Sequence, residues 1–414
     1  MNGALYYLSI EETSARIRAG DVSPIAVVDA CLARIEALGS RLNAFITVLA
    51  DEARDRAHEA DTEIRAGRWR GPLHGIPIGV KDFYDTAGVR TTAAFEKFTD
   101  RIPAKDADVV AALKNAGAIV VGKTNMHRLG MGTTGLESAF GATANPWNDA
   151  YIPGGSSSGS AAAVAAGLCY ATIDTDAIGS CRLPAACCGV DGFKGTYDAI
   201  SAKGVLEGEP ADPVIVWLAH PGITTRSAGD TARILETLVE PEARARVFGA
   251  PSAASQSQTP LRIGMADNAP GEDAVTRAFE AAVDTLRTLG HSIVSAAAPF
   301  DMPRFGDLHR IEADRAAIAD RVFARVDLLV LPTLPTTVLP VKDARANPQS
   351  LSPAYTMFAN YFGLPAISVP CGFDTRGLPV GMQIVGRPWG DAAVLRLAQE
   401  YERAATAARP HPIP

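Results

Sequence analysis

Four serine hydroxyls lie close together at residues 153–160, in the stretch "PGGSSSGS". A serine hydroxyl becomes a good nucleophile only when a neighbouring group removes its proton. The stretch matches the G-x-S-x-G pattern of a nucleophile elbow, which would make Ser157 the nucleophile, but an elbow follows directly on a strand. Here it follows the turn-forming "ANPWNDAYIPGG". A flexible Gly/Ser linker is a second local interpretation, although the uncharged "SAAAVAAG" that follows predicts a buried helix.

Two other stretches contain groups that could activate a serine: "GIPIGVKDFYDT" at 75–86 and "DTDAIGSCRLPAACCGVDGFKG" at 174–195. Lys81 ends the apolar run "IPIGV". A lysine acts as a base only when it is neutral, and lowering its pKa from about 10.4 to about 7 costs roughly 4–5 kcal/mol. Burial beside an apolar strand can supply that shift, although a lone lysine at a strand end is usually a solvated charge.

Together with "IPGGSSSGSAAAVAAG", these stretches resemble the amidase signature family of serine hydrolases. The resemblance extends to "GTTGLESAFGATANPWN" at 132–148 and "GLPAISVPCGFDTRGLPVGMQIVGRPW" at 363–389. It implies an α/β fold with a large mixed β-sheet flanked by helices on both faces. It also implies amide hydrolysis through an acyl-enzyme, with no metal or organic cofactor.

The resemblance also assigns roles to individual residues. The nucleophile would be Ser180, in the Gly-Ser-x-Arg-x-Pro-Ala match at 179–185. The general base would be Lys81. Ser156, carried on a cis peptide in the family, would pass the proton of Ser180 to Lys81 and later return one to the leaving nitrogen. The remaining assignments are an oxyanion hole formed by the N–H groups of Ala177, Ile178, Gly179 and Ser180, substrate contacts from Met131, Gly132 and Thr175, and supporting hydrogen bonds or ion pairs from Ser157, Asp176 and Arg182.

The sequence departs from the family pattern at Ile178, where the family has glycine. If that position requires a positive φ, isoleucine would be strained there. Alternatively, its side chain narrows the acyl pocket, with room left by Ala177, which replaces a larger threonine. The chain is also shorter than many relatives between about residues 230 and 325, so the substrate class is not implied. An amidase-like subunit of an amidotransferase, or a non-catalytic binding relative, is therefore the alternative function.

Helical and strand-like patterns alternate along the chain, which predicts an α/β fold. Helices are predicted at 9–19, 24–38, 48–66, 106–116, after Ser158, at 273–289 and after Asp391; strands are predicted in the run ending at Lys81 and at 118–125, 169–176, 261–265, 291–297, 326–333, 366–373 and 379–386. Strands occur on both sides of the low-complexity segment 248–261. We therefore expect one domain over 1–414, with a short helical N-terminal region at 1–70, a mobile loop at 248–261 and a loose tail at 407–414.

Composition excludes several classes of partner. The 414 residues have a net charge of −7, which is not the basic excess that nucleic-acid binding needs. The most apolar stretch, 161–173, is shorter than the roughly 20 residues that span a membrane, and the N-terminus lacks a secretion signal. The six cysteines have no CxxC spacing. We expect a cytoplasmic protein that binds a small amide and binds neither nucleic acid nor membrane. A homodimer is one oligomeric state that the sequence allows.

Overall fold

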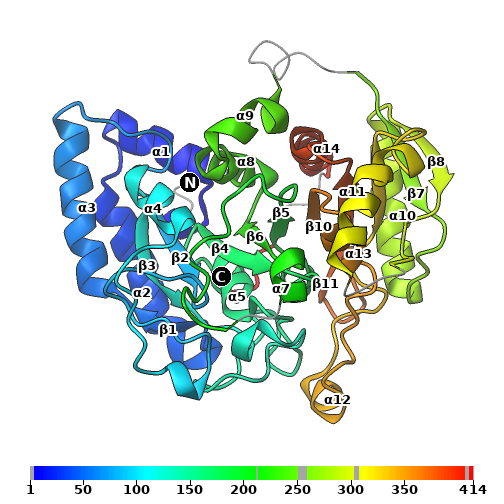
Figure 1. The fold of residues 1–414 in the computed structure, drawn as a ribbon. Helices are drawn as coiled ribbons and strands as arrows, with labels where there is room; N and C mark the ends of the chain where they lie inside the picture. Colours follow the sequence, from blue (N-terminus) through cyan, green and yellow to red (C-terminus); the bar gives the residue numbers. More distant parts are fainter. Residues whose placement is uncertain (1–3, 211–212, 250–258, 303–306, 406–409, 414) are drawn as a thin grey trace.

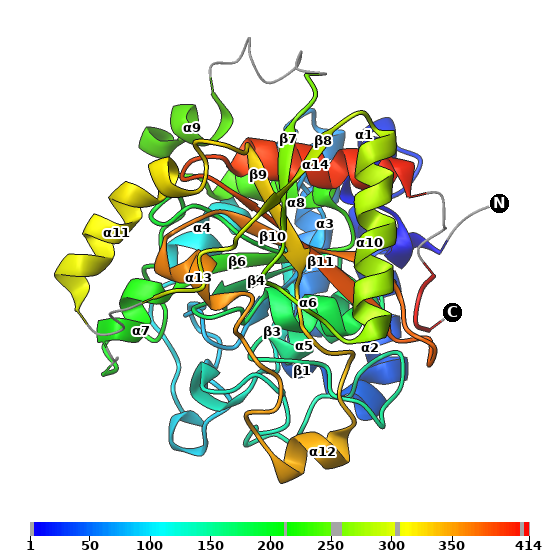
Figure 2. The ribbon, with the colours of Figure 1, turned by 90° about the vertical axis from the view of Figure 1, so that its right-hand side faces the viewer.

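The computed structural model describes residues 4–210, 213–249, 259–302, 307–405 and 410–413. One mixed sheet of 11 strands runs through this part of the chain, with helices on both of its faces (Figures 1 and 2). This confirms the predicted α/β fold with a large mixed sheet. Within the same residues, no helix has the length and apolar character needed to cross a membrane.

The elements have the following bounds. The strands are β1 Phe45–Val48, β2 Pro77–Lys81, β3 Ile119–Thr124, β4 Ala171–Asp176, β5 Asp191–Lys194, β6 His220–Thr225, β7 Arg262–Ala266, β8 Ser292–Ala296, β9 Leu328–Pro332, β10 Ala366–Phe373 and β11 Pro379–Gly386. The helices are α1 Ile10–Ala19, α2 Pro24–Leu42, α3 Ala50–Arg65, α4 Asp108–Asn115, α5 Ser158–Ala165, α6 Arg182–Cys188, α7 Pro213–Leu218, α8 Ala228–Leu238, α9 Pro241–Phe248, α10 Asp273–Thr288, α11 Leu308–Arg321, α12 Val341–Ala346, α13 Met357–Tyr361 and α14 Asp391–Ala404, with 3-10 turns at Leu5–Tyr7, Glu96–Phe98 and Arg128–Gly130.

The strand order places the strands next to the candidate residues inside the sheet, away from both of its edges. The sheet runs β1-β3-β2-β4-β6-β5-β10-β11-β9-β7-β8. Strand β2 is parallel to β3 and β4, and β7 is parallel to β8 and β9, whereas the other pairs are antiparallel. Because β2 and β4 are parallel neighbours, their carboxyl ends lie together. Lys81 therefore lies beside the segment that follows Asp176.

The N-terminal helices begin where the sequence predicts, because their caps are local. Ser9 accepts the N–H of Glu12 at the start of α1, and Ser23 accepts the N–H of Ala26 at the start of α2. Helix α3 begins at Ala50, later than predicted. The preceding strand β1, which pairs with β3, was not predicted.

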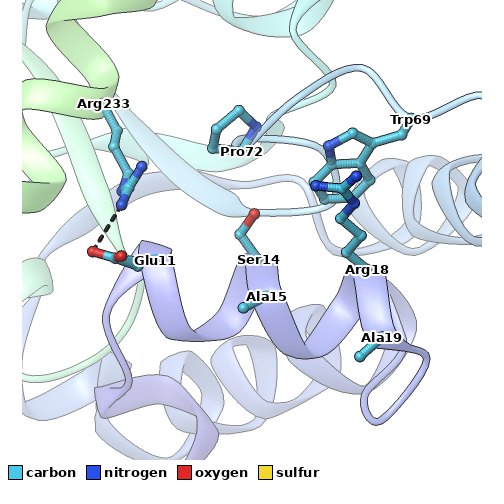
Figure 3. A pocket seen from close by; sticks show the side chains of 8 residues that line it. All are labelled: Glu11, Ser14, Ala15, Arg18, Ala19, Trp69, Pro72 and Arg233. Atoms are coloured by element: carbon cyan, nitrogen blue, oxygen red, sulfur yellow. Dashed lines mark ion pairs between the residues drawn. The ribbon is translucent and has the colours of Figure 1, made fainter.

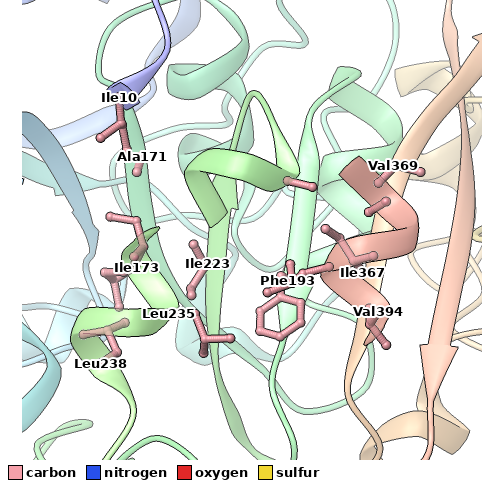
Figure 4. Packing of buried hydrophobic residues seen from close by; sticks show 14 of the residues in the cluster. Ile10, Ala171, Ile173, Phe193, Ile223, Leu235, Leu238, Ile367, Val369 and Val394 are labelled. Atoms are coloured by element: carbon pink, nitrogen blue, oxygen red, sulfur yellow. The ribbon is translucent and has the colours of Figure 1, made fainter. Parts of the chain in front are cut away.

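Apolar residues on alternate positions of the central strands belong to the largest of four buried hydrophobic clusters in the described part of the chain. Ile173 of β4, Ile223 of β6, Phe193 of β5 and Ile367 of β10 pack with residues of α8 and α14 on one face (Figure 4). The intervening positions of β2 and β4 point the other way. Lys81 therefore lies on the face covered by α5 and α6.

The two expected loose segments turn out differently. Most of the predicted mobile loop, residues 250–258, lies outside the described residues. Of the predicted loose tail, residues 410–413 are described, and they contact the N-terminal region. The ring of His411 stacks on Tyr7 with 3.6 Å between centroids, and the Tyr7 hydroxyl donates to the carbonyl oxygen of Ile413 (2.5 Å).

Candidate active site

Lys81 is the centre of a buried cluster of hydroxyls. Its Nζ donates to Oγ of Ser156 (2.8 Å), Oγ of Ser157 (2.9 Å) and Oγ1 of Thr175 (3.0 Å). The lysine side chain is completely buried. An ammonium group has only donors, whereas an amine also has a lone pair, and each hydroxyl can either accept or donate. The cluster can therefore satisfy Lys81 in both protonation states.

The surroundings of Lys81 favour its neutral form. Burial lowers its pKa to about 8, against the opposing charge of Asp174. Asp174 is itself buried, and its Oδ2 accepts from the hydroxyls of Thr172 and Thr224. Burial raises the pKa of Asp174, so its own tendency to ionise is weakened. A lysine with this pKa can serve as a base near neutral pH.

Ser180 lies between β4 and α6, next to the serine stretch. The backbone N–H of Ser157 donates to the carbonyl oxygen of Ser180 (3.0 Å), which joins the two segments. Ser156 follows a cis peptide bond with Gly155, and its carbonyl oxygen accepts from the N–H of His127 (2.9 Å). The Ser180 hydroxyl has no hydrogen-bond partner among the described residues, and the residue is only 5% exposed. That hydroxyl is therefore not committed to a structural hydrogen bond.

Asp176 and Arg182 hold the loop that contains Ser180. Their side chains form a fully buried ion pair at 2.9 Å, as predicted. Burial alone would raise the pKa of Asp176, but the charge and hydrogen bonds of Arg182 outweigh it and lower the pKa. The carboxylate also accepts the N–H groups of Gly179 (2.7 Å) and Cys181 (3.2 Å). Both residues thus support the loop from inside the protein.

The structure corrects the predicted oxyanion hole at one position. The N–H of Gly179 donates to Asp176 and is not available to a substrate. The N–H groups of Ala177, Ile178 and Ser180 have no hydrogen-bond partner within the described part of the chain. Three of the four predicted amides therefore remain available for an oxyanion.

Backbone strain at Ile178 is not found. Ile178 is absent from the described non-glycine residues with positive φ; the left-handed conformation belongs instead to Gly179, with φ +130°. A Cβ at Gly179 would lie 2.2 Å from Oγ1 of Thr356, so no larger residue fits there without displacement. The position that requires glycine is therefore 179, where this sequence has glycine, and not 178.

The three predicted substrate contacts have different surroundings. The hydroxyl of Thr175 accepts a hydrogen bond from Nζ of Lys81, so this residue is one of the hydrogen-bond partners of the lysine. Met131 is 68% exposed. The preceding residue, Gly130, lies near Ser156, because a Cβ added to this glycine would be 3.7 Å from Oγ of Ser156. A Cβ on Gly132 would meet Nε2 of His127 at 2.2 Å. Met131 is therefore the one of the three whose side chain is open to an incoming molecule.

Residues from the C-terminal third support the loop, and the sequence analysis missed them. Thr356 donates to the carbonyl oxygen of Ile178 (2.5 Å), Asn360 donates to the carbonyl oxygen of Asp176 (2.7 Å), and Gln383 accepts from Arg182 (2.5 Å). All three are completely buried. A usable signal was present: Gln383 interrupts the apolar strand "GMQIVG", and Thr356 and Asn360 have the four-residue spacing of one helix face.

The two local interpretations of the serine stretch do not fit the structure. Residues 152–176 are all buried, so the stretch is not a flexible linker. Ser157 follows an irregular segment, and the preceding strand, β3, ends at Thr124, so the strand-to-helix turn of a nucleophile elbow is absent there. Close packing explains one of the glycines, because a Cβ on Gly159 would lie 2.3 Å from the carbonyl oxygen of Ala44.

Two surface cavities lie apart from these residues. One, of about 420 Å³, lies between α1, residues 69–72 and α8, and the ion pair of Glu11 and Arg233 (2.7 Å) bounds it (Figure 3). The other, of about 570 Å³, is lined by residues of α2, β1 and the start of α3. Neither is lined by Lys81, Ser156 or Ser180. Both cavities are therefore separate from the buried cluster at the carboxyl ends of β2 and β4.

Comparison with known proteins identifies the family of the chain. A family model described as Amidase matches residues 26–306 and 307–395. The chain is 33% identical to a glutamyl-tRNA(Gln) amidotransferase subunit from Synechococcus sp. (strain CC9605), over 96% of both chains. Its fold is similar to that of a 6-aminohexanoate cyclic dimer hydrolase (TM-score 0.85, 25% identity, 99% of both chains) and the peptide amidase from Stenotrophomonas maltophilia (TM-score 0.83, 28% identity, 98% of both chains). The chain belongs to the amidase signature family.

Proposed function

We propose that this amide hydrolase uses Ser180 as its nucleophile, Ser156 as a proton relay and Lys81 as its general base. The observation that supports the assignment most strongly is the buried hydrogen bond between Lys81 and Ser156, at 2.8 Å. A lysine whose pKa burial lowers to about 8 can accept a proton in this position. Ser157 and Thr175 hold the lysine in place through its other two hydrogen bonds.

The proposed reaction has two halves. As Oγ of Ser180 attacks the amide carbon, its proton passes to Ser156, and the proton of Ser156 passes to neutral Lys81. Negative charge on the former carbonyl oxygen is stabilised by the three available N–H groups of the loop. When the C–N bond breaks, Lys81 returns the proton through Ser156 to the leaving nitrogen. Water then attacks the acyl-enzyme by the same route, which releases the acid and restores Ser180.

Labelling with a fluorophosphonate tests the assignment without a known substrate. We expect one covalent adduct on Ser180 in the wild-type protein, located by mass spectrometry. We also expect release of ammonia or amine from at least one member of a panel of small carboxamides, anilides, ureido compounds and esters. An adduct on Ser157, or no adduct and no turnover, would contradict the proposal and favour a non-catalytic relative.

Ile178→Gly is expected to broaden the range of acyl groups that the enzyme accepts. The isoleucine is half-buried in the loop that contains Ser180, and its side chain occupies space that glycine would leave open. Rates with bulky acyl groups should rise relative to those with an acetyl group, in competition assays between paired substrates. Ile178→Val, which keeps most of the side chain, is the control.

The same variant tests a different idea about Ile178. If the wild-type loop lacked an oxyanion donor, Ile178→Gly would accelerate every substrate alike, by about two to three powers of ten. A uniform gain of that size would contradict the hypothesis that the Ile178 side chain narrows the acyl pocket. It would indicate instead that the wild-type oxyanion hole is impaired.

A second candidate function is that of one component of an amidotransferase. It is favoured by the curated relatives, because subunits of a glutamyl-tRNA(Gln) amidotransferase match at 33% identity over nearly the whole chain. Such a component would release ammonia from glutamine through the same serine chemistry. Ammonia release from glutamine by the purified chain, compared with release from simple amides, distinguishes the two. A cytoplasmic location and a homodimer stay predictions from the sequence.

A further inference from the structure

The segment that contains Thr356 packs directly against the loop before Ser180. Thr356 is completely buried, and its Oγ1 donates to the carbonyl oxygen of Ile178 (2.5 Å). It lies so close to Gly179 that a Cβ there would collide with its hydroxyl at 2.2 Å. Two segments that are 178 residues apart are therefore in contact at the carbonyl group of Ile178.

Thr356 and Asp176 together fix one peptide unit of the loop. In a trans peptide, the carbonyl oxygen and the N–H point in opposite directions. In the unit between Ile178 and Gly179, the oxygen is held by Thr356 and the N–H is held by Asp176 (2.7 Å). Gly179 has no Cβ to restrict its rotation, so the backbone on its own would not hold this orientation.

Thr356 is itself held in place by the buried charges behind the loop. Arg182 donates to the carbonyl oxygen of Thr356 (2.9 Å) and to Oδ1 of Asn360 (2.6 Å). Asn360, one helical turn later, donates to both the carbonyl oxygen and the carboxylate of Asp176 (2.7 and 2.9 Å). The hydroxyl is thus presented to the loop from a rigid support.

We propose that Thr356 is a positioning residue for the oxyanion hole. By fixing the peptide unit between Ile178 and Gly179, its hydroxyl sets the directions of the two flanking N–H groups, those of Ile178 and Ser180. Its hydroxyl bonds to the carbonyl oxygens of Ile178 and Pro353, not to the Ser180 hydroxyl. This inference rests on the proposed function, because it concerns the charge that develops when Ser180 attacks.

The rate of fluorophosphonate labelling measures this effect directly. Attack of Ser180 on phosphorus places negative charge on the phosphoryl oxygen, which then needs the same N–H groups. We expect Thr356→Val to lower the maximal labelling rate by about tenfold to a hundredfold, because losing a whole oxyanion donor costs about 10²–10³. The concentration for half-maximal rate should change little. Thr356→Ser, which keeps the hydroxyl, should restore the rate.

A matched control separates this effect from a general loss of stability. Thr13 is also completely buried, and its hydroxyl donates to the Tyr170 hydroxyl (3.1 Å), but it lies on α1. Thr13→Val should label at the wild-type rate. Thermal unfolding of each variant shows which proteins are folded, and Thr356→Ala provides a second variant without the hydroxyl.

The outcomes distinguish this inference from the proposed function. If folded Thr356→Val and Thr356→Ala label as fast as the wild type, Thr356 does not position the oxyanion hole, while Ser180 stays the nucleophile. If Thr356→Ser labels as slowly as Thr356→Val, the hydroxyl is not the group responsible, and the inference is wrong. If the wild type itself is not labelled at Ser180, the proposed function fails first and the inference fails with it.

Discussion

Ser180→Ala is expected to reduce turnover to background while leaving the fold intact. Removing a serine nucleophile from a related type of catalytic unit costs about six powers of ten in rate. The hydroxyl has no hydrogen-bond partner among the described residues, so its loss breaks no structural contact. Steady-state assays with the best substrate of the panel check the rate, and thermal unfolding checks the fold.

Ser157→Ala is the comparison variant that tests whether Ser157, rather than Ser180, is the nucleophile. Ser157 comes from the neighbouring stretch, and its hydroxyl binds Lys81. We expect this variant to retain measurable turnover, since a relay through Ser156 stays in place. The assignment of the nucleophile would be wrong if Ser180→Ala kept its activity while Ser157→Ala lost it.

Activity is expected to rise with pH along a limb centred near pH 8. Burial lowers the pKa of Lys81 to about 8, so below this pH the lysine is protonated and cannot accept the proton of Ser180. Above it, the amine is neutral and kcat/KM should reach a plateau. A histidine base would place the limb nearer pH 6.5. Lys81→Met should lose both the limb and nearly all activity.

Lys123 provides a matched control for this prediction. Burial also lowers its pKa to about 8, but its Nζ donates to the carbonyl oxygen of Tyr84 and to Thr91, not to the serines. Folded Lys123→Met should therefore keep the limb near pH 8. If its loss moved the limb, while Lys81→Met left the profile unchanged, the wrong lysine would have been assigned.

The segments that contain the proposed catalytic residues could be recognised in the sequence because each has a local pattern. Lys81 ends an apolar run, and Ser180 lies in a motif of seven consecutive residues. Strand β6 shows the opposite case: "HPGITT" contains both proline and glycine, which weaken any strand pattern, yet it pairs between β4 and β5 in the sheet. Its pairing depends on neighbours that are distant in the sequence.

The directions of the backbone N–H groups in the loop 177–180 could not be predicted from the sequence either. The resemblance implies that the N–H of Gly179 is part of the oxyanion hole. In the structure this N–H donates to the carboxylate of Asp176. The carbonyl oxygen of the same peptide unit, that of Ile178, accepts from the hydroxyl of Thr356, which is 178 residues away in the sequence. Contacts of this kind arise from tertiary packing, which local patterns do not encode.

The anchored tail has a topological consequence. Because the carbonyl oxygen of Ile413 accepts from Tyr7 and Arg34, residues 410–413 lie beside the first described residues of the chain. Neighbouring termini are the geometry that makes circular permutation feasible. A short linker from residue 413 to residue 4, with new ends placed in a surface loop, would permute the order of the described elements while leaving the strand pairing of the sheet unchanged.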